Sequence, residues 1–254
     1  ANSRKGTTKI LIGLLIIVVI TAFSACGAGG GGEDDGKGGG FLKKSEEPVD
    51  ISILCVGDVM AHSTNLSAGG GNSYSFTDNY EYVRSYIEDA DLALCNVETT
   101  FRGGQPHGYP TFNAPDELAY ALADVGFDVG ITSNNHMMDT GFDGMQRTLE
   151  VLRNQGMTTV GSRYAGEDTW SLIEKNGLKI GLVAYTYESP MTASGAVSIN
   201  GNYVSKEAAE LINSFNTDEM EEDLGKITAD IKSAKEAGAD IVVCYMHWGN
   251  EYQR

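Results

Sequence analysis

Apolar residues along this chain fall into short continuous runs that alternate with longer amphipathic segments. The runs have the length and continuous apolar character of strands covered on both faces, and we expect strands at 50–60, 91–98, 127–133, 157–162, 178–187 and 240–249. The intervening segments predict helices at 80–90, 115–126, 145–156 and 220–238. In the last three, apolar residues recur at helical spacing and a glycine ends the pattern. The alternation predicts an α/β domain over residues 50–254.

The first 49 residues have a different character. A short basic stretch precedes an apolar run at 10–23, which is shorter than the roughly 20 residues of a membrane span but fits the core of a signal peptide. Small residues then lead to Cys26, and residues 1–26 resemble a bacterial lipoprotein signal in which that cysteine is lipidated. An uncleaved anchor helix is the alternative. Residues 27–49 are a Gly-rich acidic linker, and both interpretations place the domain outside the cytoplasmic membrane, anchored to it.

The charge of the chain limits its partners. It carries 35 Asp and Glu against 18 Lys and Arg, a formal net charge of −17. Such an acidic surface repels nucleic acid, so we expect no nucleic-acid partner. Beyond Cys26, the cysteines at 55, 95 and 244 lie in apolar runs and are expected to be small buried hydrophobic residues and not thiolate ligands.

Four of the predicted strands end in side chains that bind metals. The residues concerned are carboxylates, carboxamides and imidazoles, namely Asp58, Asn96, Glu98, Asn135, His136 and His247. The carboxyl ends of strands are where α/β sheets bind ligands. Oxygen and imidazole donors together suit a divalent cation such as Mn, Fe or Zn. The sequence therefore predicts a metal site at this edge.

Four motifs carry a family resemblance. "GDVM", "NVETTF", "SNNHMMDTG" and "MHWGNEY" occur in this order and spacing, and residues 50–254 resemble the CapA family of bacterial capsule-synthesis (poly-γ-glutamate capsule) proteins. That family is similar to the calcineurin-like metallophosphoesterases. The resemblance implies a layered α/β/β/α sandwich and a site with two divalent metal ions.

The resemblance also implies roles for single residues. Asp58 matches a ligand of one metal, and Glu98 takes the place of the bridging aspartate. Asn135 and His247 match further ligands, whereas His136 matches the histidine that protonates the leaving group. The chain departs from the superfamily pattern in two places. Met60 stands where the first motif has a histidine, with His62 displaced by two residues, and the final Gly-His-x-His motif is absent, so we expect a domain truncated at its carboxyl end.

Neighbouring polar residues have less distinctive explanations. Asn134 is expected to satisfy backbone groups in the turn. Asp139 either orients His136 or caps the following helix. His62 belongs equally well to the site or to a loop, and Glu251 is an additional candidate.

Two functions fit these observations. One is a metal-dependent, phosphoesterase-like hydrolase acting outside the cell. The other is a non-catalytic envelope component that binds or exports an anionic polymer, together with the polymer's synthesis machinery. Replacement of the bridging aspartate by Glu98 and loss of the first-motif histidine favour an altered site.

Overall fold

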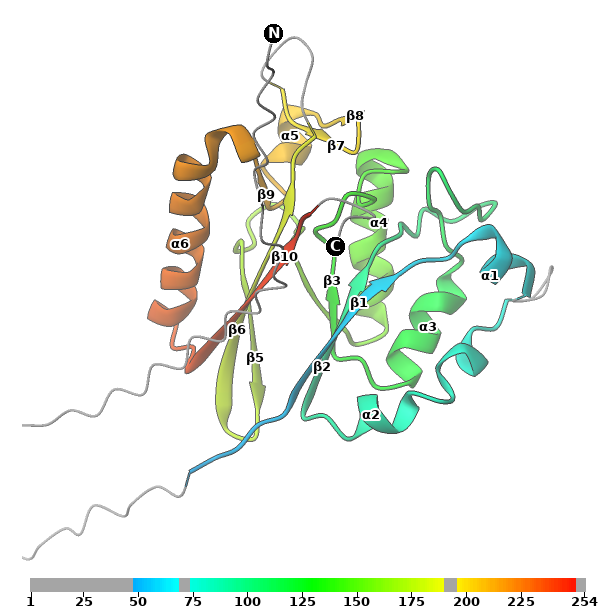
Figure 1. Cartoon of the computed structure of the whole chain (residues 1–254), viewed down its shortest axis with the longest axis horizontal. Coiled ribbons are helices and arrows are strands. Elements are labelled where there is room, and N and C mark those ends of the chain that lie inside the picture. Colours follow the sequence, from blue (N-terminus) through cyan, green and yellow to red (C-terminus); the bar gives the residue numbers. More distant parts are fainter. Residues whose placement is uncertain (1–47, 69–73, 190–195, 250–254) are drawn as a thin grey trace, which may run out of the picture.

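Two β-sheets packed face to face form the centre of the fold (Figure 1). The computed structural model describes residues 48–68, 74–189 and 196–249. The first sheet is wholly parallel, and its strands lie in the order β1 (Ile53–Val59), β2 (Leu92–Val97), β3 (Val129–Ile131) and β4 (Thr158–Val160).

The second sheet is mixed. Its order is β10 (Ile241–His247), β6 (Leu178–Tyr187) and β5 (Ser171–Lys175), with β10 parallel and β5 antiparallel to β6. The short strand β9 (Ser214–Phe215) pairs in parallel with the carboxyl end of β6. A separate small hairpin consists of β7 (Ser198–Ile199) and β8 (Asn202–Tyr203).

Helices cover the outer faces of both sheets. The first sheet carries α1 (Ser63–Ala68), α2 (Arg84–Glu88), α3 (Asp116–Asp124) and α4 (Gly141–Asn154), and the second carries α6 (Met220–Glu236). The short α5 (Lys206–Ala209) follows the β7–β8 hairpin, and 3₁₀ turns occupy Thr77–Tyr80 and Thr217–Glu219. The resulting layers are α/β/β/α, so the expected sandwich is confirmed.

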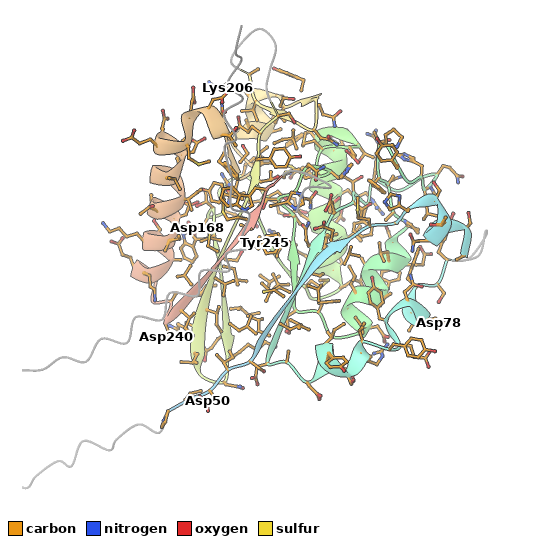
Figure 2. All side chains as sticks on the ribbon, in the orientation of Figure 1. Asp50, Asp78, Asp168, Lys206, Asp240 and Tyr245 are labelled. Atoms are coloured by element: carbon orange, nitrogen blue, oxygen red, sulfur yellow. The ribbon has the colours of Figure 1, made fainter. Side chains whose placement is uncertain are left out.

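Alternation along the strands assigns each side chain to a layer. Leu92 and Leu94 of β2 face the second sheet, whereas Ala93 and Cys95 face the helices. On β10, Val243 and Tyr245 face the first sheet, and Figure 2 shows Tyr245 in the space between the sheets. The same parity turns Asn96 and His247 toward each other across the sandwich, and Asn96 Nδ2 lies 3.2 Å from His247 Nδ1.

One predicted helix is shorter in the structure, and several short elements were not predicted. The helix expected at 80–90 is only Arg84–Glu88, and a 3₁₀ turn at Thr77–Tyr80 precedes it. The antiparallel pair β5–β6 was not predicted. Its turn is Asn176–Gly177, and both residues have positive φ, which is the usual two-residue hairpin connection.

The cysteine prediction is only partly right. Cys95 is buried and Cys244 is half-buried, but Cys55 is exposed because β1 is an edge strand. Among the described residues, none of the helices is sufficiently long and apolar to cross a bilayer. The expected signal at 1–26, with Cys26, lies outside the described residues, as do the expected linker (27–49) up to residue 47 and the candidate Glu251.

Candidate metal centre

The carboxyl ends of β1, β2 and β10 place two carboxylates and an imidazole together. Asp58 lies near the end of β1, Glu98 directly follows β2, and His247 is the last residue of β10. One ligand atom from each of these three residues lies within 4.8 Å of the other two. The Glu98 side chain is only 7% exposed, whereas that of Asp58 is 49% exposed, so the cluster opens to solvent on the Asp58 side.

An irregularity in β1 aims Asp58 at this cluster. Cys55 pairs with Leu94, but Asp58 pairs with Asn96, so three steps along β1 match two along β2. The extra residue is a β-bulge, a feature that often redirects a side chain at an active site. The bulge brings Asp58 directly beside Asn96.

Asn96 is the hydrogen-bonding centre of the cluster. Its side chain is fully buried, and its Nδ2 donates to Asp58 Oδ1 at 2.8 Å and to Glu98 Oε2 at 3.3 Å. The same nitrogen lies 3.2 Å from His247 Nδ1. Asn96 Oδ1 accepts from Asn134 Nδ2 at 3.1 Å. One amide nitrogen therefore contacts all three members of the cluster.

One tautomer of His247 fits both of its contacts. If Nε2 carries the proton, it donates to Asn135 Oδ1 at 2.8 Å and leaves Nδ1 to accept from Asn96. Burial lowers the pKa of His247, the Asp58 carboxylate opposes this shift, and His136 adds to it. A neutral imidazole with the Nδ1 lone pair directed at the carboxylates is the form that ligates metals.

His136 is held by a separate set of contacts. Its Nδ1 lies 2.7 Å from Asp139 Oδ2, and the same oxygen accepts from the backbone N–H of Phe112 at 2.6 Å. The Phe112 ring packs edge-on against the imidazole with centroids 4.7 Å apart. Nε2 faces the cluster, 3.9 Å from Glu98 Oε1. Asp139 therefore orients His136, and it does not cap α4, whose N-cap residue is Thr140.

The other candidate residues lie around this centre. Asn134 donates to the carbonyl of Val97, and its Oδ1 accepts from the backbone N–H of His136, as a turn-stabilising residue should. His62 is exposed, and its ring makes a T-shaped contact with the Phe112 ring, with centroids 4.9 Å apart. No ligand atom of His62 belongs to the cluster of Asp58, Glu98 and His247 found among the described residues.

Sequence reasoning missed two aromatic residues near the site, Phe112 beside His136 and Tyr187 beside His247. The Tyr187 ring stacks on the His247 ring at 6.4 Å with an interplanar angle of 11°. Tyr187 ends the apolar run of β6, and only the pairing of β6 with β10 brings it to the histidine.

The donor set and one further observation fit a divalent cation. Two carboxylates and an imidazole are hard and borderline donors suited to Mn, Fe or Zn. Thr186, which pairs in register with His247, has a buried hydroxyl oxygen with no partner among the described residues. A buried polar atom without a partner is costly and normally binds water or a ligand. The thiols are poor alternatives, because burial raises the pKa of Cys95, and raises that of Cys244 to about 11.

The layered sandwich, with acidic and imidazole side chains at the carboxyl ends of its strands, defines a metallophosphoesterase-like fold. Within that class the chain belongs to the family described as "Bacterial capsule synthesis protein PGA_cap", whose model matches residues 52–254.

Two curated relatives are similar in sequence. The capsule biosynthesis protein CapA of Bacillus anthracis is 25% identical over 219 residues, which are 82% of this chain and 49% of that protein. The PGA biosynthesis protein CapA of Bacillus subtilis (strain 168) is 31% identical over 180 residues, 68% of this chain and 43% of that protein. The chain thus spans about half the length of these relatives.

Proposed function

We propose that this protein acts in capsule or poly-γ-glutamate biosynthesis as a metal-dependent hydrolase that cleaves a phosphoester or a related bond. The observation that carries the proposal is the convergence of Asp58, Glu98 and His247 beside an oriented His136. Family membership and the names of the relatives support the biological process.

Asp58, Glu98 and His247 would hold the first divalent ion, and Asn135 would contribute its side-chain oxygen to a second. Bound divalent ions of this kind polarise a phosphoryl or acyl oxygen and lower the pKa of bound water. The half-exposed side of Asp58 gives a substrate access to the centre. Asn96 would keep the carboxylates in place from the buried side, since its nitrogen contacts both of them.

His136 would protonate the leaving group. Asp139 accepts a hydrogen bond from Nδ1, so Nε2 is the nitrogen that exchanges a proton at the site. The imidazole is almost fully buried between Phe112 and Glu98, and it therefore has little freedom to turn. A positioned general acid of this kind typically contributes 10²- to 10⁴-fold to the rate.

Metal content and turnover together test this function. Full-length protein would be purified, loaded with Mn or Zn, measured by elemental analysis, and assayed with an aryl phosphodiester. Asp58→Asn should lose metal, whereas His136→Gln should keep it and lose turnover by about 10²-fold or more. His107→Gln, in an exposed loop, is the matched control. Wild-type metal content in Asp58→Asn, or unchanged turnover in His136→Gln, would contradict the proposal.

A non-catalytic role is the second candidate. Glu98 and Met60 depart from the superfamily pattern, and this favours a centre that binds an anionic envelope polymer through its metal ions without cleaving it. Metal-dependent retention of the polymer with no turnover in any assay would favour this role over hydrolysis.

The proposed location is the outer side of the cell membrane, through a lipid on Cys26. Stable anchoring requires two acyl chains, because one gives only marginal binding. Cys26→Ser should release the protein from the membrane fraction or leave it unprocessed. Unchanged processing and unchanged membrane association would favour the uncleaved anchor helix.

A further inference from the structure

The side chain of Thr186 lies in the space between the two sheets, beside the candidate metal centre. On β6, Leu182 and Ala184 face the first sheet, and Thr186 continues this alternation. Thr186 also pairs in register with His247, the residue that β10 contributes to the cluster. Residues paired in register on neighbouring strands lie on the same face of the sheet. The hydroxyl group of Thr186 is therefore a neighbour of the imidazole on the face that forms the metal centre.

This hydroxyl group has no partner among the described residues. The Thr186 side chain is fully buried, and its Oγ1 makes no hydrogen bond there. On one side, both ring nitrogens of His247 are engaged in other contacts. On the other side, Ser214 of β9 donates its own hydroxyl to Glu188 at 2.7 Å. The backbone N–H of Thr186, by contrast, donates to the carbonyl of Asn213 at 3.2 Å.

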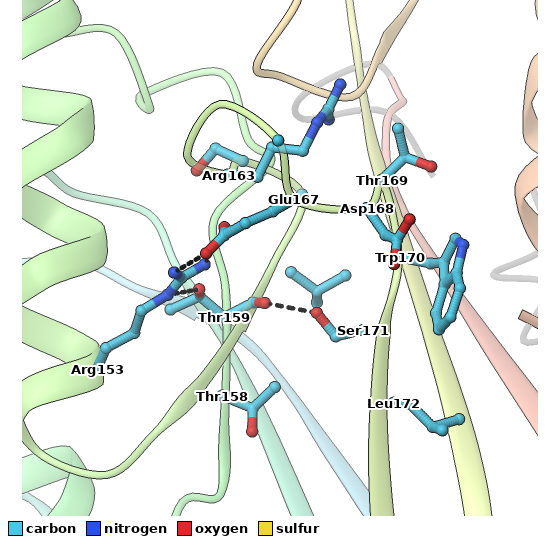
Figure 3. A pocket seen from close by; sticks show the side chains of 14 residues that line it. Arg153, Thr158, Thr159, Arg163, Glu167, Asp168, Thr169, Trp170, Ser171 and Leu172 are labelled. Atoms are coloured by element: carbon cyan, nitrogen blue, oxygen red, sulfur yellow. Dashed lines mark hydrogen bonds and ion pairs between the residues drawn. The ribbon is translucent and has the colours of Figure 1, made fainter. Parts of the chain in front are cut away.

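Hydroxyl groups elsewhere in the fold are mostly paired. Those of Thr100, Thr132 and Thr148 donate to backbone carbonyls. In the cavity of about 600 Å³ beside β4 and β5, the dashed lines of Figure 3 mark the hydrogen bonds of Thr159 and Ser171. Within the described part of the chain three buried hydroxyl groups lack a partner, and that of Thr186 is the one in register with a residue of the cluster.

The strand itself does not need this hydroxyl group. Valine has nearly the shape of threonine and is also a good strand former. It would fill the same space without burying a polar atom, whose loss of hydration is costly unless a hydrogen bond replaces it. A threonine at this position therefore indicates a hydrogen-bond partner that belongs to a bound ligand and not to the protein.

We propose that Thr186 holds a water ligand of the divalent ion bound by Asp58, Glu98 and His247, and is thus a positioning residue of the metal centre. A catalytic ion with three protein ligands keeps a further position for water. A hydroxyl group both donates and accepts, so it can orient such a water from the buried side, opposite the solvent-exposed Asp58. This inference rests on the metal centre of the proposed function, but it does not depend on hydrolysis.

Metal titration of the full-length protein tests the role of Thr186. Wild type, Thr186→Val and Thr186→Ser would be purified in detergent, stripped with a chelator, and titrated with Mn²⁺ and with Zn²⁺ by calorimetry. Thr186→Val removes the hydroxyl group and should weaken metal binding by about 10-fold or more, as the loss of contacts around metal ligands typically does. Thr186→Ser keeps the hydroxyl group and should bind nearly as tightly as wild type.

Stability without metal gives a second measurement with the opposite sign. In urea denaturation with a chelator, the midpoint of Thr186→Val should be at least as high as that of wild type, because valine buries no polar atom. Adding the ion should raise the midpoint of wild type more than that of the variant, since the more tightly bound ligand stabilises more. An ordinary structural hydrogen bond of Thr186 would instead lower the midpoint of the variant in the chelator and leave metal affinity unchanged.

Ser198→Ala is the matched control. Its hydroxyl group is also buried without a partner among the described residues, but it lies on the separate β7–β8 hairpin, so its removal should leave metal affinity unchanged. Circular dichroism establishes that each variant is folded. If Thr186→Val does not fold, Thr186→Ala also removes the hydroxyl group, and the affinity criterion applies to it.

The outcomes separate this inference from the metal centre itself. Metal affinity of Thr186→Val equal to that of wild type, or a lower midpoint of that variant in the chelator, would overturn the role of Thr186 and leave the metal centre standing. An equal loss of affinity in Thr186→Ser and Thr186→Val would also overturn it, because the hydroxyl group would then not be the cause. If wild type binds neither ion, the metal centre and this inference both fail.

Discussion

Replacing Asn96 by Asp would test the geometry of the metal centre without any assumption about its reaction. The side chain keeps its shape, but the nitrogen that donates to Asp58 at 2.8 Å and to Glu98 at 3.3 Å becomes a carboxylate oxygen. Two hydrogen bonds are thus exchanged for two repulsive contacts between like charges. Without metal, Asn96→Asp should therefore be less stable than wild type.

The size of the loss has an upper bound. Like charges this close would repel by several kcal/mol, but the protein avoids that cost by keeping one carboxyl protonated. Protonating an ordinary Asp carboxyl, with a pKa near 3.9, costs roughly 4 kcal/mol at pH 7. Asp58 is half-exposed, so solvent screens part of the repulsion. We expect a loss of about 2–4 kcal/mol at pH 7.

The pKa of the introduced carboxyl determines how the loss of stability changes with pH. The folded state raises the pKa of the introduced carboxyl above its unfolded value, so the folded state holds the proton more tightly. The electrostatic part of the loss is then complete above the folded pKa, shrinks as the pH falls, and is absent below the unfolded pKa of about 4, where only the lost hydrogen bond remains. A bound divalent cation should also remove it, because the new carboxylate becomes a further ligand.

Urea denaturation of the full-length chain in a chelator, at several pH values between 5 and 8, measures this loss. Asn96→Ala is the matched control, since it removes the same hydrogen bonds without adding charge and should cost about 1–2 kcal/mol at every pH. If Asn96→Asp is as stable as Asn96→Ala at pH 7, or if its deficit is the same at pH 5 and pH 7, the described arrangement of the carboxylates is wrong.

Three further variants test other contacts. Asp139→Asn buries an amide where an oxygen now accepts two hydrogen bonds, and it should cost about 2 kcal/mol in urea denaturation. Gly181→Ala places a methyl group 3.0 Å from the Ala234 side chain, beneath α6, and should lower the free energy of unfolding by about 1–3 kcal/mol. Tyr185→Phe removes a 2.6 Å hydrogen bond to Asp230, and thermal melting should show a loss of about 1–2 kcal/mol. Unchanged stability in any of them would contradict the contact concerned.

The strands could be predicted from sequence because most of them are buried. β2 is buried along its whole length and β6 along most of it, so apolar runs without alternation marked both. β5 lies at an edge and alternates between half-buried and exposed positions, which made it inconspicuous. The Asn176–Gly177 pair between β5 and β6 is a typical hairpin turn, and it indicates a strand before β6 that the sequence prediction overlooked.

The members of the candidate site could be predicted, but their contacts could not. Asp58, Glu98 and His247 stood out because each follows an apolar run. The carboxyl ends of parallel strands lie at the same edge of a sheet, where ligands bind. The central position of Asn96 depends on a β-bulge in β1 and on how two separate sheets face each other. Neither is encoded in local residue patterns.

The candidate metal centre takes its residues from both sheets, so a bound ion would link the two layers of the sandwich. Among the described strands β10 pairs only with β6, so it can detach by breaking one ladder, and detachment would remove His247 from the carboxylates. An ion bound at 100 times its dissociation constant stabilises the assembled form by about 2.7 kcal/mol. A bound cation would thus hold β10 beside the first sheet. Amide hydrogen exchange along β10 should therefore slow when the ion binds.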